Sequence, residues 1–174
     1  KRIKKFIEDQ ELHPVAILLT HGHFDHVMAV DSVRAAYHIP VYAAEAEKET
    51  MQDASINLSI NMGGAMLSIE ADHWLKDGET ITLLDQEVRC ILTPGHTVGG
   101  MCFYFPKAGM LFSGDTLFQE SVGRTDFPGG SMSEIVRSIR EKLFVLPDAV
   151  QVYPGHGLMT SIKNEKMFNP FAVE

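Results

Sequence analysis

The segment THGHFDH, residues 20–26, places three histidines and one aspartate within a few positions, directly after the apolar run VAILL. An apolar run of this kind predicts a buried strand. His21 and His23 are two positions apart on the extended stretch that leaves this strand, so both imidazoles can point the same way and bind one cation. Asp25 and His26 follow at the start of a predicted helix, where they can reach a second cation. The segment therefore predicts a metal site at the end of a strand.

Three further turns present a histidine or an aspartate directly after a predicted strand. They are TPGHTVGG with His96, FSGDTLF with Asp115 and YPGHG with His156. Each turn contains glycine, which permits unusual dihedral angles and close approach of the backbone. A single histidine beside a glycine is more often a surface residue than a ligand, so the prediction depends on the recurrence at four strand ends. The seven candidates divide over two metal ions, and one carboxylate is left to bridge the gap of about 3.5–4 Å between such ions.

A closed structural zinc site is the alternative for such a cluster, but it would favour cysteine ligands. The chain has two cysteines, Cys90 and Cys102, in the apolar runs VRCIL and MCFYF, and neither has ligand spacing. We expect both to be buried thiols of the core, because free cysteine is among the residue types most often buried. Two such cysteines make no disulfide framework and fit a reducing cytoplasm. Histidine and aspartate donors without cysteine suit zinc, iron or manganese.

The elements that must position these side chains alternate between strand and helix patterns. Short runs that are β-branched or aromatic and bounded by Gly, Pro or Asp predict strands at 15–20, 40–44, 80–84, 88–93, 101–105, 109–113 and 150–154. Apolar residues at helical spacing predict helices at 1–10, 26–37, 45–52 and 131–146. LLDQEV predicts a hairpin, and the aperiodic segment 53–69 predicts a long loop that can act as a lid. The pattern predicts an α/β domain with mixed sheets and helices on the outer faces.

Length and charge exclude several classes of protein. The 174 residues and the 45% hydrophobic content favour one globular domain, residues 1–174, with a real core. The net charge of −8 argues against a nucleic acid or an anionic membrane as the main partner. No run of 18 apolar residues predicts a membrane span. We therefore expect a small-molecule partner and a cytoplasmic protein.

The first ten residues, KRIKKFIEDQ, place Ile3, Phe6 and Ile7 on one face of a helix that has no N-cap before it. We therefore expect a longer parent chain with about 30–40 further residues upstream, the length of two or three short strands with their turns. Strand 15–20 would then have a neighbour on each side. Without those residues we expect an unpaired apolar edge in the sheet.

THGHFDH resembles the HxHxDH signature of the metallo-β-lactamase superfamily. TPGHTVGG, FSGDTLF and YPGHG resemble the later metal motifs of that superfamily and occur in the same order. The segment SVGRTDFPGG and the closing NPF resemble the glyoxalase II-like branch, the hydroxyacylglutathione hydrolases, in their short bacterial form. The resemblance covers almost the whole chain. It implies an αββα four-layer sandwich that lacks its first N-terminal strands in this chain.

The resemblance also implies a role for each of the seven residues. One divalent ion would be held by His21, His23 and His96, and the other by Asp25, His26 and His156, with Asp115 as the bridge. Two such ions, zinc in the first place and iron or manganese otherwise, lower the pKa of bound water to about 7. The resulting hydroxide would attack a thioester or ester carbonyl. Asp25 would orient this nucleophile, so Asp25 and Asp115 are the catalytic candidates.

This sequence departs from the family pattern at both ends. The early strands are missing, with the acidic turn that supports the metal site, and so is the C-terminal helical domain that grips glutathione in full glyoxalase II enzymes. The metal chemistry therefore carries over and the glutathione specificity does not. An iron-dependent persulfide dioxygenase, with one iron on His21, His96 and Asp115, is an alternative, as is a lactonase. The acidic charge argues against a nuclease, and the complete ligand set argues against a non-catalytic remnant.

Other polar residues have two interpretations each. Arg124 and Asp126 can belong to a substrate-facing loop that also supports the metal ligands, or to a solvated turn with an internal ion pair. His13, His38 and His73 lie outside every motif, and we expect them to be ordinary surface or core histidines.

Overall fold

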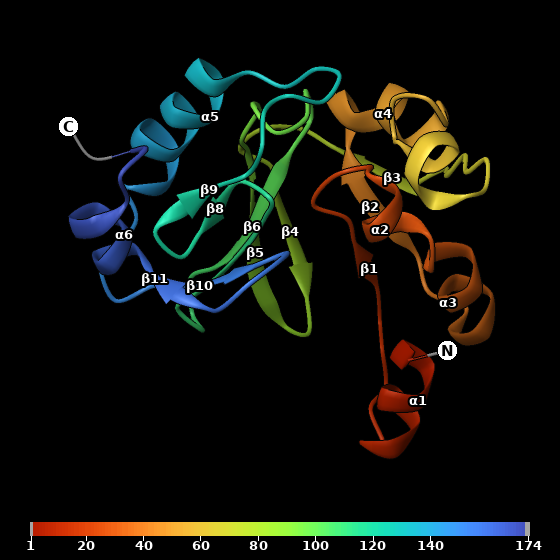
Figure 1. Cartoon of the computed structure of the whole chain (residues 1–174). Coiled ribbons are helices and arrows are strands. Elements are labelled where there is room, and N and C mark those ends of the chain that lie inside the picture. The colour runs from red at the N-terminus through yellow and green to blue at the C-terminus, as the bar shows by residue number, and fades with distance from the viewer. Residues whose placement is uncertain (1, 173–174) are drawn as a thin grey trace.

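Two β-sheets pack face to face, and helices cover the outer face of each sheet (Figure 1). The computed structural model describes residues 2–172. The smaller sheet has three parallel strands in the order β1 (Ile17–Leu18), β2 (Val41–Ala44) and β3 (His73–Leu75). The larger sheet has six strands in the order β11 (Thr160–Ser161), β10 (Gln151–Pro154), β7 (Met110–Gly114), β6 (Met101–Phe105), β5 (Gln86–Leu92) and β4 (Thr80–Leu83). β7 and β10 pair in parallel and the other pairs of this sheet are antiparallel.

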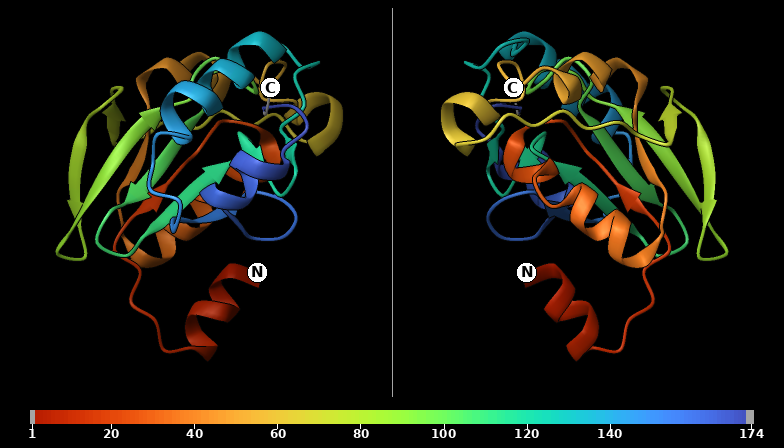
Figure 2. Two further views of the ribbon diagram at one scale, coloured as in Figure 1. Left: turned by 90° about the vertical axis from the view of Figure 1, so that its left-hand side faces the viewer. Right: turned by 90° about the vertical axis from the view of Figure 1, so that its right-hand side faces the viewer.

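The helices and the small third sheet complete the layers. The helical elements are α1 (Arg2–Asp9), α2 (Phe24–Val27), α3 (Val30–Tyr37), η1 (Glu45–Glu47), α4 (Lys48–Gln52), η2 (Ser59–Gly63), α5 (Met132–Ser138), η3 (Ile139–Leu143) and α6 (Ile162–Phe168). β8 (Leu117–Phe118) and β9 (Ser121–Val122) form a separate hairpin. α5 and α6 lie in front of the larger sheet in the left view of Figure 2, and α3 in front of the smaller sheet in the right view. The expected α/β class and αββα layering are therefore confirmed.

The alternation of side chains along β6 shows why the layers form. Met101 and Phe103 are buried against the smaller sheet, in a cluster that includes Leu75. Cys102 and Tyr104 point to the opposite face and pack with residues of α5 and η3. Successive side chains of a strand point to opposite faces, so a strand that is apolar at every position is buried on both sides. The expectation that both cysteines are buried is confirmed, because Cys90 lies in the same inter-sheet cluster.

The predicted hairpin is present between β4 and β5. Leu83 pairs with Gln86, which leaves a turn of two residues, Leu84 and Asp85. Both turn residues have positive φ values, 53° and 57°. Turns with two left-handed residues match the right-handed twist of antiparallel strands, so this turn sets the register of the edge of the larger sheet.

Several elements differ from the sequence-based expectations. All seven predicted strands are present, whereas β3, β8, β9 and β11, each of two or three residues, were not predicted. β1 is equally short, but it lies within the longer apolar run 15–20. The predicted helix 26–37 begins earlier and is divided into α2 and α3. α6 was not predicted because its pattern is broken: Glu165 is buried, whereas Met167 and Phe168 are exposed. The segment 53–69 is mostly irregular, as expected, but contains the helical turn η2.

The N-terminal elements lie at the periphery. α1 has no buried residue and extends from the two-sheet body in both views of Figure 2; residue 1 of the predicted helix lies outside the described residues. Within residues 2–172, β1 pairs only with β2, so the expected second neighbour is absent from this part of the chain and the expected unpaired edge is seen. A hollow of about 280 Å³ with an apolar lining lies beside it, between α1, β1 and α3. No helix in the described part of the chain is long and apolar enough to cross a membrane.

Candidate metal centre

All seven candidate ligands converge at one edge of the two sheets. They follow the ends of four strands, β1 in the smaller sheet and β5, β7 and β10 in the larger one. Their donor atoms form groups of three that lie within 4.8 Å of one another, namely His21, His23 and His96; His21, His26 and Asp115; and Asp25, His26 and His156. The predicted convergence of the four motifs is therefore observed: all seven residues predicted from the sequence lie together at this edge.

The first group, which we call the buried triad, consists of His21, His23 and His96. Their exposed fractions are only 2%, 3% and 4%. The Nδ1 atom of His23 lies 3.0 Å from Nε2 of His96. The Nδ1–H group of His96 donates a hydrogen bond of 2.7 Å to the carbonyl oxygen of Arg124. A carbonyl oxygen can only accept, so this bond leaves the Nε2 lone pair of His96 directed at the other two imidazoles.

The second group, the exposed triad, consists of Asp25, His26 and His156. The side chains of His156 and Asp25 are 57% and 38% exposed, and that of His26 is 17% exposed. Nε2 of His156 lies 3.1 Å from Oδ2 of Asp25 and 3.3 Å from Nε2 of His26. Two nitrogen donors and one carboxylate thus face a common point at the rim of the site.

Asp115 lies between the two triads. Its Oδ1 atom is 3.4 Å from Nε2 of His26, and its Oδ2 atom is 3.6 Å from Nε2 of both His96 and His156. Gly155 makes this approach possible, since a Cβ atom there would collide with the carboxylate of Asp115 and the ring of His26. Burial raises the pKa of the Asp115 carboxyl group, against the opposing effect of the neighbouring histidines. A carboxylate in contact with both triads is in the position of a bridge.

The side chains fit a pair of divalent cations. Nε2 of His21 and Oδ1 of Asp115 are buried and have no hydrogen-bond partner, which is rare for buried polar atoms. Burial, and then the neighbouring imidazoles, lower the pKa of His21 well below its ordinary value and that of His23 to about 4. Burial also lowers the pKa of His26, although Asp115 and Asp25 act in the opposite direction. Neutral imidazoles are the form that binds metal, so the cluster is prepared for cations at neutral pH.

A pocket of about 420 Å³ opens above both triads. The apolar part of the lining comes from α2, the segment 53–69, the strands β8 and β9 and the loop after β9; its residues are Phe24, Leu58, Met62, Phe118, Val122 and Phe127. The amide N–H of Phe24 donates to the carbonyl oxygen of Asn57 at 2.9 Å, and the Asn57 side chain donates to the carbonyl oxygen of Leu67 at 2.9 Å. The segment 53–69 is thereby attached to the metal loop and forms one side of the pocket.

The loop that carries Arg124 shows features of both predicted alternatives: it faces the pocket and supports a metal ligand, and it also contains an internal ion pair. The Arg124 carbonyl supports His96, and the Arg124 side chain lines the pocket. Its guanidinium group also donates two hydrogen bonds to the Asp126 carboxylate, at 2.7 and 2.6 Å, and lies 3.9 Å from the centre of the Phe127 ring. These hydrogen bonds lower the pKa of Asp126 to about 2.

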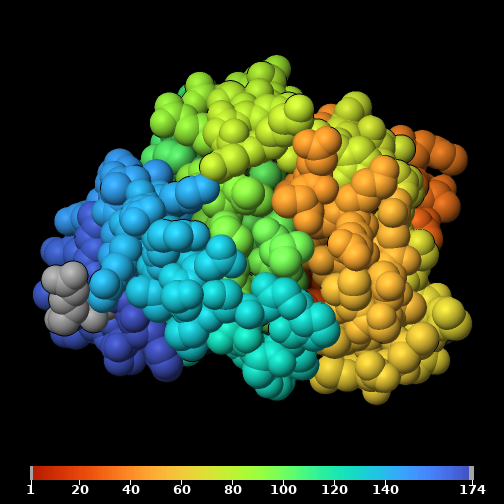
Figure 3. Space-filling view, turned by 90° about the horizontal axis from the view of Figure 1, so that it is seen from above, coloured from red at the N-terminus to blue at the C-terminus, as the bar shows by residue number. Residues whose placement is uncertain are grey.

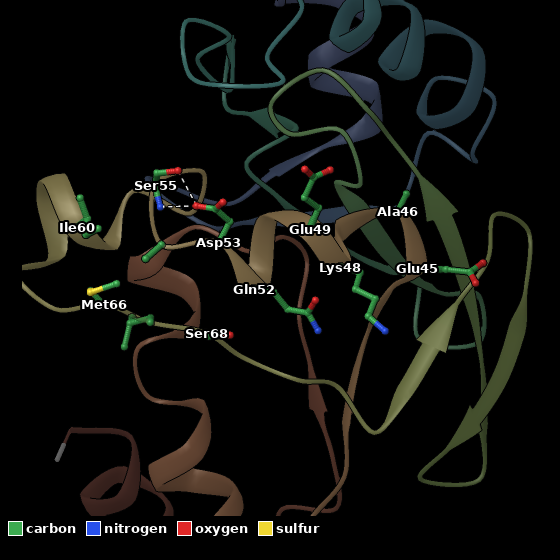
Figure 4. A pocket seen from close by; sticks show the side chains of 12 residues that line it. Glu45, Ala46, Lys48, Glu49, Gln52, Asp53, Ser55, Ile60, Met66 and Ser68 are labelled. Carbon is green, nitrogen blue, oxygen red and sulfur yellow. Dashed lines mark hydrogen bonds between the residues drawn. The ribbon is translucent and has the colours of Figure 1, made fainter.

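A larger hollow, about 950 Å³, lies on the outer side of η1 and α4 (Figure 4). Glu45, Lys48, Glu49 and Gln52 project along it, and Asp53 accepts hydrogen bonds from Ser55. None of the three ligand groups found in the described residues lies there. Size alone therefore does not mark the site, and the smaller pocket above the triads is the better candidate.

Sequence reasoning did not find Glu47, a carboxylate that is only 1% exposed beside the buried triad. It lies in the run AEAEKE, whose alternating charges are typical of a solvated helix. Its carboxylate accepts hydrogen bonds from Gly22, Thr97 and Gly99. The apolar residues of β8 and β9 at the pocket were also not predicted as site residues, and no signal in the sequence distinguishes them from core residues.

Known proteins with similar sequences span almost the whole chain. The family model described as the metallo-β-lactamase superfamily matches residues 2–156. The probable metallo-hydrolase YqgX of Bacillus subtilis is 40% identical over 171 residues, which is 98% of this chain and 81% of that protein. The hydroxyacylglutathione hydrolase GloC of Haemophilus influenzae is 35% identical over 175 residues, covering 98% of this chain and 82% of that protein.

Solved structures show the same arrangement of layers. The B3 metallo-β-lactamase BLEG-1 has a TM-score of 0.93 and 39% identity, covering 99% of this chain and 84% of that one. TTHA1623 in a di-iron-bound form has a TM-score of 0.85 and 34% identity, covering 98% and 83%. ETHE1 from Myxococcus xanthus has a TM-score of 0.78 and 27% identity, covering 98% and 68%.

Proposed function

The chain belongs to the metallo-β-lactamase superfamily, and from this premise we propose that it is a metal-dependent hydrolase that cleaves a small thioester of the hydroxyacylglutathione type, or an ester. The observation that carries the proposal is the pair of triads joined by Asp115 beneath one pocket. The similarity to GloC supports the glyoxalase II-like branch.

Each triad would hold one divalent ion, and Asp115 would contact both. When bound, the two ions supply a nucleophilic hydroxide at neutral pH and polarise the carbonyl group that it attacks. We propose zinc as the metal, with iron or manganese as the alternatives, because the donor set contains only histidine and aspartate. The di-iron form of TTHA1623 keeps iron among the candidates.

The chain's own residues would bind and orient the reactants. The apolar wall, which includes Phe24, Leu58 and Phe127, would bind the acyl group and exclude bulk water from the carbonyl. The carboxylate of Asp25 faces the pocket at its rim, where it would accept a hydrogen bond from the attacking water and orient it. Asp25 and Asp115 are thus the proposed catalytic carboxylates.

We propose a small molecule as the partner, rather than nucleic acid or membrane, and a cytoplasmic location. The net charge of −8 supports the first proposal, since anionic polymers and anionic surfaces would be repelled. The two free, buried cysteines are compatible with the second.

A persulfide dioxygenase with one iron on His21, His96 and Asp115 is the alternative, and a lactonase is a further one. The fold is similar to that of ETHE1 from Myxococcus xanthus, but also to that of BLEG-1, so the fold does not discriminate. The exposed triad supports the hydrolase, because a mononuclear site would leave the converging donors of Asp25, His26 and His156 without a metal to bind.

Elemental analysis combined with two assays tests the proposal. We expect two ions per chain, release of thiol from a hydroxyacylglutathione, and no oxygen uptake with glutathione persulfide. Asp25→Asn, which keeps the size of the side chain, is the matched control for background hydrolysis and should lose most of the activity. One iron per chain with oxygen consumption would replace the proposal by the dioxygenase, and cleavage of lactones alone would replace it by the lactonase.

A further inference from the structure

Glu47 is a fully enclosed carboxylate that none of the metal motifs contains. It ends η1 and is 1% exposed. Its Oε1 atom accepts a hydrogen bond of 2.9 Å from the amide N–H of Gly22. Its Oε2 atom accepts from the hydroxyl group of Thr97 at 3.0 Å and from the amide N–H of Gly99 at 2.7 Å. Burying a carboxylate is costly unless it is hydrogen-bonded in this way, so its position has a definite structural reason.

The donors to Glu47 are directly adjacent to the ligands of the buried triad. Gly22 lies between His21 and His23, and Thr97 follows His96. These two loops leave different sheets, β1 in the smaller one and β5 in the larger one. One carboxylate therefore fixes the distance between the two loops that carry all three imidazoles.

The backbone is built for this close approach. A Cβ atom at Gly99 would collide with the backbone of Ala46 and Glu47. Figure 3 shows the two segments meeting on the upper face, the turn after β5 in green and the η1–α4 segment in orange. The neighbours Glu45, Lys48 and Glu49 project along the outer hollow (Figure 4), whereas Glu47 alone among these acidic residues is buried.

We propose that Glu47 is a positioning residue for the metal ion of the buried triad, which it serves by holding the loop of His21 and His23 against the loop of His96. This inference rests on the metal site of the proposed function and is independent of its substrate. Outer partners of metal ligands typically contribute 10–100-fold to metal affinity. Removal of one acceptor oxygen from Glu47 should therefore weaken binding of the first ion about 10–100-fold.

The chain offers a matched control in Glu165, which is 0% exposed. Its carboxylate also accepts several hydrogen bonds, from Glu120 N, Thr160 Oγ1, Asn164 Nδ2 and Asn169 Nδ2, at 2.6–3.0 Å. None of these donors is adjacent to a ligand of the buried triad. Glu165→Gln therefore repeats the burial and the loss of an acceptor oxygen without the proposed role.

The test compares Glu47→Gln with Glu165→Gln in the full chain. Titration with Zn²⁺ against a competing chelator gives the affinity of the tighter site, and the visible spectrum of the Co²⁺-loaded protein reports its ligand geometry. Thermal unfolding of the chelator-treated protein measures the stability of each variant. We expect both variants to lose stability, but only Glu47→Gln to lose metal affinity, about 10–100-fold, and to change the Co²⁺ spectrum.

Thr97→Val and Thr97→Ser provide a second pair if Glu47→Gln does not fold. Thr97→Val removes the hydroxyl donor and should weaken metal binding, whereas Thr97→Ser keeps the hydroxyl group and should bind metal as tightly as the wild type. Affinity of a folded Glu47→Gln within about twofold of the wild type, or an equal loss in Glu165→Gln, would overturn the positioning role. For the Thr97 pair, equal metal affinity of the two variants would overturn the positioning role.

The wild-type chain separates this inference from the proposed function. A wild-type chain that binds two ions without cleaving thioesters refutes only the proposed substrate, and one that binds no divalent ion refutes both the proposed function and the role of Glu47.

Discussion

The two triads differ in how firmly the protein holds them. The three side chains of the buried triad have exposed fractions of 2–4%. Glu47 joins the two loops that carry them, and the carbonyl group of Arg124 holds the ring of His96. The exposed triad lies at the rim, and its ligand His156 is followed by Leu158 and Met159, which are 72% and 51% exposed. Ligands that are fixed before binding lose less entropy when the ion arrives. The difference indicates a tight first site and a more labile second site.

The largest effect is expected from Asp115→Ala, which removes the carboxylate that lies between the two triads, within 3.6 Å of His26, His96 and His156. Two cations would then repel each other without an intervening negative charge. We expect kcat/KM to fall by more than the roughly 100-fold that loss of an outer partner costs, and metal occupancy to fall below two ions per chain. Elemental analysis and steady-state kinetics measure both. Two retained ions with near-normal turnover would show that Asp115 does not bridge.

His96→Ala and His156→Ala should separate the two sites. Loss of His96 should abolish the tight site, because one of three buried donors is removed. Loss of His156 should leave one ion bound in the buried triad. Removal of metal from the wild-type protein by a chelator should accordingly show a fast and a slow phase, and the fast phase should be absent in His156→Ala. A single phase, or equal loss of metal in both variants, would contradict the proposed difference between the triads.

The buried triad should also make the metal-free protein sensitive to acid. The pKa of His23 is lowered to about 4, below its value of about 6.5 in the unfolded chain. Between these values the unfolded state binds more protons than the folded state, so stability is lost as the pH falls. We expect up to about 1.4 kcal/mol per pH unit from this residue. Urea unfolding at several pH values measures the slope, and His23→Gln should reduce it; an unchanged slope would contradict the assignment.

The same contrast explains what the sequence alone could reveal. The four ligand motifs were found because each places a histidine or an aspartate just after an apolar strand, and strand ends of the two sheets meet at one edge. Glu47 and Glu165 were not found. A buried glutamate has no local signature, since its partners Gly22, Thr97 and Gly99, or Thr160 and Asn169, come together only in the folded chain.

The elements follow a similar rule. Strands of four or more residues were predicted because their apolar patterns are long enough to recognise, whereas β3, β8, β9 and β11 consist of two or three residues. β1 also has two residues, but it lies within the longer apolar run 15–20, and this run predicted it. Such short strands form because a neighbouring strand offers a partner, as β2 does for β3. Tertiary pairing, which a linear pattern does not contain, decides them.

The smallest effects are expected from histidines outside the two triads. His13 and His38 are exposed and contribute to none of the ligand groups in the described part of the chain. His38 ends α3 with φ 53° and ψ 43°, a conformation whose cost of about 1–2 kcal/mol falls on any residue with a Cβ atom. His38→Ala should therefore change stability by only a few tenths of a kcal/mol, and His13→Ala by less than about 0.5 kcal/mol. Neither should alter metal content or turnover by more than about twofold, because such surface changes do not contact a metal ligand.

His38→Gly is the sharper control. It relieves the left-handed strain, so it should not lower stability, and it should leave the metal content unchanged. Loss of metal in any of these variants would mean that metal also binds to histidines at the surface, outside the two triads. Metal content would then not report on the triads, and the proposed difference between them would be contradicted.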